Sequence, residues 1–342
     1  MNVSVIVSTF RRARLLKQSL AAILRNNYRD FEIILIDQTP DESTRKVVEE
    51  SFRNEPRLLY FHSERIGTAA GWNLGLSHAT GELILVTDDD VIVPDHWISA
   101  HVQCHLRLRN EGINPGVVGG PSIGLWEAPK PVWWPDDFLY VLSEFGMEAD
   151  RTEFIGGELP LGASYSCSRD LLEKIGGFDE RLGPKANRPS FLTVSGCDSE
   201  VALKLHRKGY PVYFCREAWV QHVMVSSRLN SAYYVIRLFR EGATQTLVER
   251  LVPNGSPSQN TNVFLINAAR FVRSLLKILI GCPLAGESPA SKRAAKELGY
   301  LSMAAGRIWG LVLFLLFLNQ PRRRDGLLEG KCIGCSDRES LT

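Results

Sequence analysis

Three adjacent carboxylates, Asp88-Asp89-Asp90, directly follow the apolar segment 82–87. Like charges at this spacing repel one another, so a bound cation is the natural way to stabilise all three. Alternate residues of an extended turn point to the same side, so Asp88 and Asp90 can converge on one ion. Hard carboxylate oxygens suit Mg²⁺ or Mn²⁺, with water and a diphosphate completing the coordination. The alternative is a solvated acidic turn in which Asp90 is a cap.

The segments that must position these carboxylates alternate between strand-like and helix-like patterns. Strand patterns cover residues 3–8, 31–36, 58–61 and 82–87, and helix patterns cover 15–24, 43–52 and 69–78. This alternation predicts an α/β fold with a right-handed, doubly wound, mostly parallel sheet flanked by helices. Such sheets bind ligands outside the carboxyl ends of their strands. Thr9, Asp37 and Asp88 all fall at such ends.

Length and composition exclude several classes of protein. At 342 residues, with 44% hydrophobic and 23% charged residues, the chain is of globular composition and long enough for a large domain plus an appendage. A net charge of +2 gives no reason to expect a nucleic-acid partner. No secretory signal is visible, and seven irregularly spaced cysteines argue against a secreted disulfide scaffold. We therefore expect a cytoplasmic protein.

Several motifs in a fixed order resemble those of the inverting family 2 glycosyltransferases, which have the GT-A fold. The motifs are residues 3–10 (VSVIVSTF), 32–37 (EIILID), 65–75 (RIGTAAGWNLG), 79–82 (ATGE), 87–91 (TDDDV), 176–180 (GGFDE), 198–200 (DSE) and 220–222 (VQH). The resemblance extends from about residue 3 to residue 242. It implies a nucleotide-sugar-binding half over 1–115 and an acceptor-binding half of the same domain over 116–250.

The resemblance places the donor nucleotide at the first two strand ends. Thr9 and Asp37 match positions that contact the base, where the Asp carboxylate accepts from a uracil- or thymine-type imide N–H. We therefore expect a UDP- or dTDP-sugar as donor. Many family members continue with Asp-Gly-Ser or Asn-Gly-Ser, whereas Gln38-Thr39-Pro40 follows here.

Further donor contacts are implied around the diphosphate. Arg65 precedes a helix whose N-terminal amides and dipole can face a diphosphate, with a surface ion pair as the alternative. Asn73 and Asp89 are assigned to the donor site, although Asn73 has the alternative of bracing the loop. His222 matches a family His near the metal or diphosphate, so Asp88, Asp90 and His222 are the predicted metal ligands. A structural role for His222 is the alternative.

The catalytic base of an inverting transfer takes the proton of the acceptor hydroxyl as that hydroxyl attacks the anomeric carbon. In the family this base lies in a Glu-Asp or Asp-Asp pair that opens a helix. Asp198 matches the base, whereas Cys197 stands where Glu is common. The alternative is that Asp198 only caps a helix over 199–208, with Glu200 as a first-turn acid.

An aromatic loop and one acid are the expected acceptor site. Trp133 and Trp134 lie in a Trp- and Pro-rich loop where family members build acceptor sites, and aromatic faces stack well on sugar rings. Core anchoring is the alternative for both. Glu200, in the 198–200 motif, is assigned to the same site.

The region 251–342 lies outside the resemblance and is expected to be a helical appendage with a disordered tail. Residues 308–320 are uncharged and very apolar, but thirteen residues are short of the ~20 that cross a bilayer. Followed by Arg322-Arg323-Arg324, they are expected to lie on the cytosolic face of the plasma membrane, within a contact region over 263–324. Packing as core or as a dimer interface is the alternative.

Together these features predict a metal-dependent inverting hexosyltransferase acting on a saccharide or lipid-linked acceptor, in surface polysaccharide biosynthesis. A nucleotidyltransferase acting on sugar phosphates also uses a doubly wound sheet, but normally has a Gly-rich loop after its first strand. A non-catalytic sugar-nucleotide-binding protein is the third alternative. Neither G-x-G-x-x-G after the first strand nor G-x-x-x-x-G-K-[ST] is present, which argues against dehydrogenase and P-loop classes.

Overall fold

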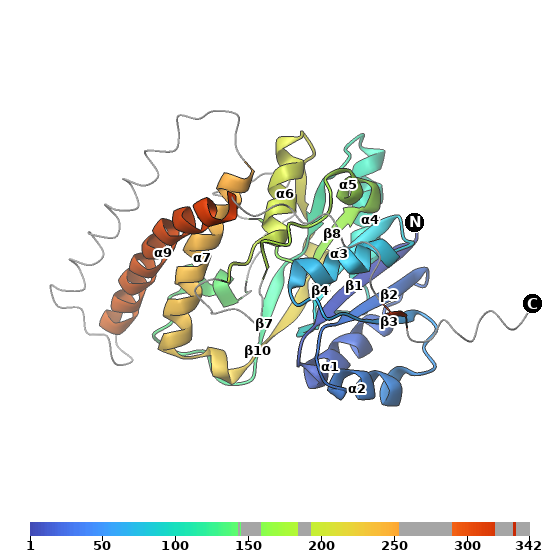
Figure 1. Ribbon diagram of the computed structural model, residues 1–342, viewed down its shortest axis with the longest axis horizontal. Coiled ribbons are helices and arrows are strands. Elements are labelled where there is room, and N and C mark those ends of the chain that lie inside the picture. Colours follow the sequence, from blue (N-terminus) through green and yellow to red (C-terminus); the bar gives the residue numbers. More distant parts are fainter. Residues whose placement is uncertain (143, 145–158, 184–192, 253–288, 319–330, 333–342) are drawn as a thin grey trace, which may run out of the picture.

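The computed structural model describes residues 1–142, 144, 159–183, 193–252, 289–318 and 331–332. Its strands in the main sheet are β1 (Val3–Thr9), β2 (Phe31–Asp37), β3 (Leu58–His62), β4 (Leu83–Asp88), β6 (Val117–Gly119), β8 (Tyr165–Ser168), β9 (Val212–Phe214) and β11 (Lys331–Cys332). They form one eight-stranded sheet in the order β11-β3-β2-β1-β4-β8-β6-β9 (Figure 1). β3, β2, β1 and β4 pair in parallel, and β8 is antiparallel to β4. The predicted mostly parallel sheet is confirmed.

Helices cover both faces of this sheet (Figure 1). They are α1 (Ala13–Leu24), α2 (Ser43–Phe52), α3 (Thr68–His78), α4 (Trp97–Asn110), α5 (Arg169–Lys174) and α6 (Cys197–Arg207). Side chains of α1, α2 and α4 pack in one hydrophobic cluster, and those of α3, α5 and α6 pack in another. The sheet is therefore the middle layer of three.

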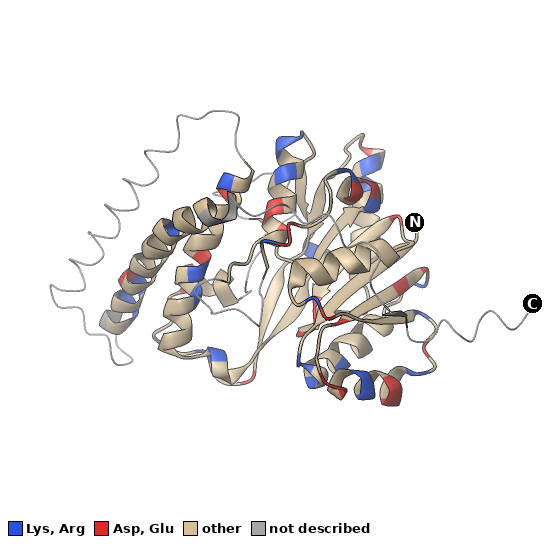
Figure 2. Ribbon diagram, in the orientation of Figure 1, with Lys and Arg blue, Asp and Glu red and all other residues tan. Residues whose placement is uncertain are grey.

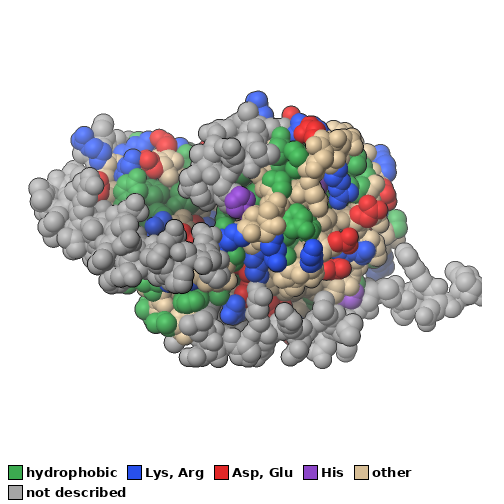
Figure 3. Space-filling model, turned by 90° about the horizontal axis from the view of Figure 1, so that it is seen from above, with side chains coloured by type: hydrophobic (Ala, Val, Ile, Leu, Met, Phe, Trp, Pro, Cys, Tyr) green, Lys and Arg blue, Asp and Glu red, His purple; other side chains and the backbone are tan. Residues whose placement is uncertain are grey.

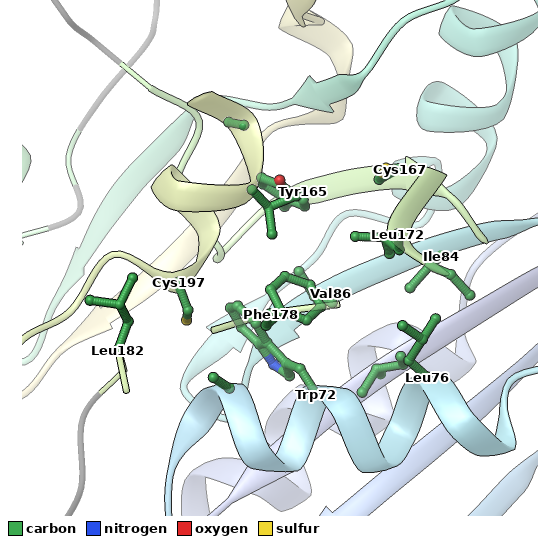
Figure 4. Close-up of a cluster of buried hydrophobic side chains, with 14 of the residues drawn as sticks. Trp72, Leu76, Ile84, Val86, Tyr165, Cys167, Leu172, Phe178, Leu182 and Cys197 are labelled. Atoms are coloured by element: carbon green, nitrogen blue, oxygen red, sulfur yellow. The ribbon is translucent and has the colours of Figure 1, made fainter. Parts of the chain in front are cut away.

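Alternation along the central strands explains this three-layer packing. Val5 and Leu85 enter the cluster beneath α1, whereas Ile6 and Ile84 enter the cluster beneath α3. Strands buried on both faces read as nearly continuous apolar runs, which is the pattern that the sequence shows. In the second cluster Trp72 meets Phe178 edge-on, with ring centroids 5.0 Å apart (Figure 4).

A second, smaller sheet lies beside the first. It contains β5 (Val91–Ile92), β10 (Val220–Met224) and β7 (Ser122–Trp126), in that order. In the antiparallel pair of β5 and β10, His222 stands opposite Val91. His222 therefore lies inside β10, whose partner β5 directly follows the acidic triplet.

The C-terminal part of the described chain is a pair of parallel helices, α7 (Ser231–Leu251) and α9 (Pro289–Leu318), which lie side by side (Figure 1). Glycines allow the close approach: a Cβ on Gly306 would lie 1.8 Å from Phe239 O, and one on Gly242 would lie 2.1 Å from Met303 O. Larger residues at these points would push the helices apart. One face of α9 is therefore packed on the domain.

The apolar helix is longer than the sequence pattern indicated. α9 has 30 residues, about 45 Å at 1.5 Å per residue, whereas the apolar run 308–320 has thirteen. A search for uncharged runs does not find the upstream turns of α9, because they contain Lys292, Lys296 and Arg307. Over Ser291–Leu315 the helix is long and apolar enough to cross a membrane: an 18-residue window within it has mean hydropathy 1.5, but 33% of that window is buried in the protein. Much of the expected contact region, 263–288 and 319–324, lies outside the described residues.

The tail expected to be disordered contains one ordered pair. Lys331 and Cys332 pair antiparallel with His62 and Phe61 at the edge of the main sheet.

Two buried histidines on α4 form a hydrogen-bonded chain with serines of the central sheet. His101 lies 3.1 Å through Nε2 from Ser164 Oγ and 2.8 Å through Nδ1 from Ser166 Oγ, and His105 Nε2 lies 2.9 Å from Ser166 Oγ. Ser164 in turn donates to Ala218 O at 2.6 Å. With both rings neutral and protonated at Nε2, Ser164 Oγ accepts from His101 and Ser166 Oγ accepts from His105, while the one hydroxyl proton of Ser166 goes to His101 Nδ1 or to Val118 O at 3.1 Å. Burial lowers the pKa of both histidines to about 3.

From these two buried, neutral histidines we predict that the folded protein loses stability at acidic pH. Above pH 6.5 the two rings are neutral in both the folded and the unfolded chain. Below pH 6.5 both histidines become protonated in the unfolded chain but stay neutral in the folded protein. The free energy of unfolding should therefore fall as pH drops from about 6.5 toward 3, by roughly 1.4 kcal/mol per pH unit for each histidine. Urea unfolding at pH 7.5 and 5.5 measures this slope.

The matched variants are His101→Gln with His105→Gln, against His62→Gln on β3 as control. The double variant should be less stable at pH 7.5 but lose less stability on acidification than the wild type. An unchanged pH slope in the double variant would show that other groups cause the acid sensitivity.

Candidate active site

The carboxyl ends of three neighbouring strands meet at one edge of the main sheet. Thr9 stands opposite Asp37 in the pairing of β1 with β2, and Ser8 stands opposite Asp88 in the pairing of β1 with β4. The parallel register thus brings Thr9, Asp37 and Asp88 together at this edge, as expected.

Asp88, Asp90 and His222 form a cluster that can hold a metal ion. One ligand atom from each lies within 4.8 Å of the others. His222 Nε2 is 3.2 Å from Asp90 Oδ1, yet that oxygen and His222 Nδ1 are both buried without a hydrogen-bond partner in the described chain. Buried polar atoms without partners are costly. Two carboxylates and an imidazole with such atoms fit a divalent cation.

Two arginines complete this cluster, and the sequence reasoning did not assign either to the site. Arg12 Nη1 lies 2.8 Å from Asp89 Oδ1 and 2.9 Å from Asp90 Oδ2, and Arg228 Nη2 lies 3.2 Å from Asp90 Oδ2. Thr9 donates to Asp89 Oδ2 at 2.6 Å. Asp89 is thus held by the first strand end and the turn after it. The position of Arg12, directly beyond β1, was the available signal.

The pKa values of the three carboxyl groups are shifted in different directions. Burial, together with Asp90 and Asp89, raises the pKa of Asp88 to about 8. Burial also works against ionised Asp90, but His222, Arg12 and Arg228 outweigh it and lower the pKa of Asp90. Burial also raises the pKa of Asp89, although Arg12 opposes this shift. Asp88 and Asp89 thus have less positive charge around them than their ionised forms need. A divalent cation bound here would supply that charge.

Asp37 and its neighbour Gln38 fix the second strand end. Asp37 is buried and accepts from Tyr60 Oη at 2.7 Å and from Thr39 N at 2.8 Å. Gln38 Nε2 donates to Arg65 O at 2.6 Å and to Gly67 O at 3.0 Å. The departure from the family sequence at position 38 therefore ties this strand end to the loop that precedes α3.

Arg65 and Asn73 brace the loop at residues 176–180. Arg65 forms an ion pair with Glu180, and Asn73 Nδ2 donates to Glu180 Oε1 at 3.1 Å and to Phe178 O at 2.9 Å. Phe178 N donates back to Asn73 Oδ1 at 2.8 Å. Arg65 thus has the ion pair, and Asn73 the bracing role, that were the alternatives to donor binding. A donor contact by either residue stays a prediction.

Asp198 lies in the first turn of α6, which begins at Cys197 rather than at Ser199. Gly196 is the N-cap, in the left-handed region at φ 90°. Asp198 Oδ1 accepts from Ser199 N at 2.8 Å and Oδ2 accepts from Gly162 N at 2.7 Å. Burial raises the pKa of Asp198, and these backbone N–H groups only partly oppose it. The negative charge of Asp198 also adds to the pKa of Asp88, so the two carboxyl groups lie within electrostatic reach of each other.

Cys197 is a core residue. It is buried with Leu182 and Phe178 in the cluster beneath α3 (Figure 4). Burial raises the pKa of its thiol well above the ordinary value. The Cys that replaces the common Glu therefore supplies packing rather than charge.

The three residues assigned to the acceptor lie deeper than expected. Trp134 is fully buried and stacks on Trp133 at 5.4 Å between ring centroids, and both rings meet Tyr234 of α7 edge-on. Glu200 is fully buried and forms an ion pair with Lys204. Of the three, Trp133 alone keeps some exposed surface. Acceptor binding by these residues stays a prediction.

Comparisons with known proteins agree with this fold and site. Residues 4–142 match the family model described as Glycosyl transferase family 2. The glucosyl-dolichyl phosphate glucuronosyltransferase of Haloferax volcanii is 24% identical over 271 residues, which are 76% of this chain and 81% of that protein. The GalNAc(5)-diNAcBac-PP-undecaprenol beta-1,3-glucosyltransferase of Campylobacter jejuni is 32% identical over 111 residues, 32% of this chain and 35% of that protein. The succinoglycan biosynthesis protein ExoM of Rhizobium meliloti is 26% identical over 253 residues, 71% and 74% of the two chains.

The structural comparison concerns the fold. The mannosyltransferase PcManGT from Pyrobaculum calidifontis, solved in complex with GDP-Man and Mn²⁺, superposes with a TM-score of 0.57 at 20% identity. The match covers 92% of this chain and 87% of that one. The protein is an enzyme with the GT-A fold that transfers glycosyl groups. Its residues 4–142 form a glycosyl transferase family 2 domain.

Proposed function

We propose that the protein is a metal-dependent inverting glycosyltransferase that moves a hexose from a nucleoside diphosphate sugar to a saccharide or lipid-linked acceptor in surface polysaccharide biosynthesis. One observation carries the proposal: Asp88, Asp90 and His222 bring three possible ligand atoms within 4.8 Å of one another, Asp90 Oδ1 is buried without a hydrogen-bond partner in the described chain, and Asp88 lies in electrostatic reach of Asp198. A metal-binding cluster beside a carboxyl of raised pKa is what this reaction needs.

The chain's own residues divide the reaction between them. Asp88, Asp90 and His222 would hold Mg²⁺ or Mn²⁺, which when bound offsets the negative charge of the diphosphate leaving group. Asp198 takes the proton of the acceptor hydroxyl while its oxygen forms a bond to the anomeric carbon and the bond from that carbon to the diphosphate breaks. The raised pKa of Asp198 makes it a stronger base, and a single displacement inverts the anomeric carbon.

A hydrolysis screen across UDP-, dTDP- and GDP-sugars, with Mn²⁺, Mg²⁺ or EDTA, tests this function. We expect slow metal-dependent release of sugar from UDP- or dTDP-sugars, because Asp37 can accept from the imide N–H of uracil or thymine. Turnover of GDP-sugars alone, like the GDP-Man bound by PcManGT, would overturn the donor assignment. Pyrophosphate release from a nucleoside triphosphate and a sugar phosphate, without hydrolysis of any nucleotide sugar, would instead indicate a nucleotidyltransferase.

We also propose that the outer face of the α9 end contacts the cytosolic membrane surface. Val312 and Leu315 are 41% and 63% exposed there, and hydrophobic side chains are visible at the left of the molecule, where α7 and α9 lie (Figure 3). Two relatives carry dolichyl phosphate or undecaprenol in their names. An apolar helix face beside an acceptor site suits a substrate that stays in the bilayer.

Charged substitutions at this face should release the protein from vesicles. Val312→Glu with Leu315→Glu should weaken co-sedimentation with anionic vesicles at least roughly tenfold, because burying two such side chains contributes about 1.5–3 kcal/mol each. Leu106→Glu on α4, where the leucine is 45% exposed, is the matched control and should bind as the wild type does. Equal binding by all three proteins would exclude lipid contact at α9. Truncation before Ile308 is a poor test, because Gly310 and Leu313 pack against the rest of the protein.

A further inference from the structure

Helix α7 touches the segment that leads to the catalytic carboxyl. Arg240 Nε donates to Thr193 O at 3.0 Å, and one turn later Thr244 Oγ1 accepts from Ser195 N at 3.0 Å. Residues four apart lie on the same helix face. This face of α7 is therefore fixed against residues three to five positions before Asp198.

The same stretch of α7 carries more positive charge than its carboxylate neutralises. Arg237 Nη1 donates to Glu241 Oε2 at 2.9 Å, and Gln245 Nε2 donates to Glu241 Oε1 at 3.2 Å, so both oxygens of this acid are engaged. Arg240, three residues from Arg237, has Thr193 O as its partner, and no described residue accepts from its terminal nitrogens. Figure 2 shows these basic and acidic bands along α7.

The surroundings add no second acid to this stretch in the described part of the chain. Arg307 of α9 donates to Gln245 Oε1 at 2.7 Å, and Tyr140 lies within electrostatic reach of Glu241 and Arg237. Burial, together with Arg237, lowers the pKa of Arg240. A half-buried guanidinium in this state is stabilised by an anion, and its planar fork suits phosphate oxygens.

We propose that Arg240, supported by Arg237, binds the phosphate of a lipid-linked acceptor, whose sugar hydroxyl then reaches Asp198. This inference rests on the proposed transfer to such an acceptor and adds where its phosphate binds. Glu241, the acid between the two arginines and Gln245, contributes to the raised pKa of Asp198, so the subsite lies on the base side of the centre. The helix pair that carries the arginines also presents Val312 and Leu315 of α9 outward, where the lipid chain would continue.

Calorimetry with farnesyl phosphate, farnesol and inorganic phosphate tests the subsite. We expect the wild type to bind farnesyl phosphate, and Arg240→Gln to weaken that binding at least tenfold. Arg240→Lys should lie between them because it keeps the charge and loses the fork. Arg293→Gln, an exposed arginine on α9, is the matched control and should bind as the wild type does.

Several outcomes would overturn the inference. Equal binding of farnesol and farnesyl phosphate by the wild type, which needs no variant to fold, excludes a phosphate subsite. Equal affinity in Arg240→Gln and wild type excludes Arg240. Inorganic phosphate that binds as tightly as farnesyl phosphate assigns the subsite to free phosphate and not to a lipid. If farnesyl phosphate does not bind while donor hydrolysis by the wild type persists, only this subsite fails, whereas loss of donor hydrolysis contradicts the proposed function.

Discussion

Asp198→Asn is expected to lower turnover by about 10²–10⁴-fold while the affinity for donor stays at the wild-type value. The amide cannot take the proton of the acceptor hydroxyl, and that proton moves only in the transition state. The effect should therefore appear in kcat rather than in donor binding. Steady-state kinetics at saturating donor, with donor affinity measured separately by calorimetry, give both quantities.

The structure also shows how this variant could mislead. Asp198 accepts from two backbone N–H groups, Ser199 and Gly162, and an Asn side chain offers one oxygen where the carboxylate offers two. Some stability should be lost for that reason, so thermal melts must accompany the kinetics. Asp170→Asn, another first-turn acid on α5, is the matched control. Wild-type turnover in a less stable Asp198→Asn protein would show that the carboxylate only fixes the start of α6.

The sheet and its binding edge were predictable from the sequence because local rules determine them. Strands buried on both faces are continuous apolar runs, and alternating helices force parallel pairing. Parallel pairing then brings Thr9, Asp37 and Asp88 to one edge, whatever the details of the loops. This part of the site follows from element order alone.

The partners of these residues were not predictable, because they come from distant parts of the chain. Arg228 reaches Asp90 across 138 positions and Arg12 reaches Asp89 across 77, and a lone arginine has no spacing that reveals its partner. Asn73 likewise contacts residues 105 and 107 positions away. Such pairs depend on how the second sheet and the 176–180 loop pack on the first sheet.

The two outer acids of the triplet should respond differently to the same substitution, although both should lose metal binding. Asp88→Asn replaces a carboxyl whose pKa is raised by burial and by its acidic neighbours, so the metal-free fold should keep its stability. Asp90→Asn removes the partner of Arg12, Arg228 and His222, and should lower the free energy of unfolding. Truncating one member of a buried ion pair leaves the other uncompensated. Thermal melts without metal measure this contrast.

Metal-dependent nucleotide binding should fall in both variants, by roughly tenfold to a hundredfold, because an amide oxygen is a weaker ligand for a hard cation than a carboxylate. Calorimetry with UDP in the presence of Mn²⁺, repeated in EDTA, separates the metal-dependent part from the rest. Asp95→Asn, an exposed acid just before α4, should bind as the wild type does. Because Asp88→Asn is expected to stay folded, a loss of affinity in that variant cannot be ascribed to unfolding. Unchanged metal-dependent affinity in both Asp88→Asn and Asp90→Asn would exclude the cluster as the metal site.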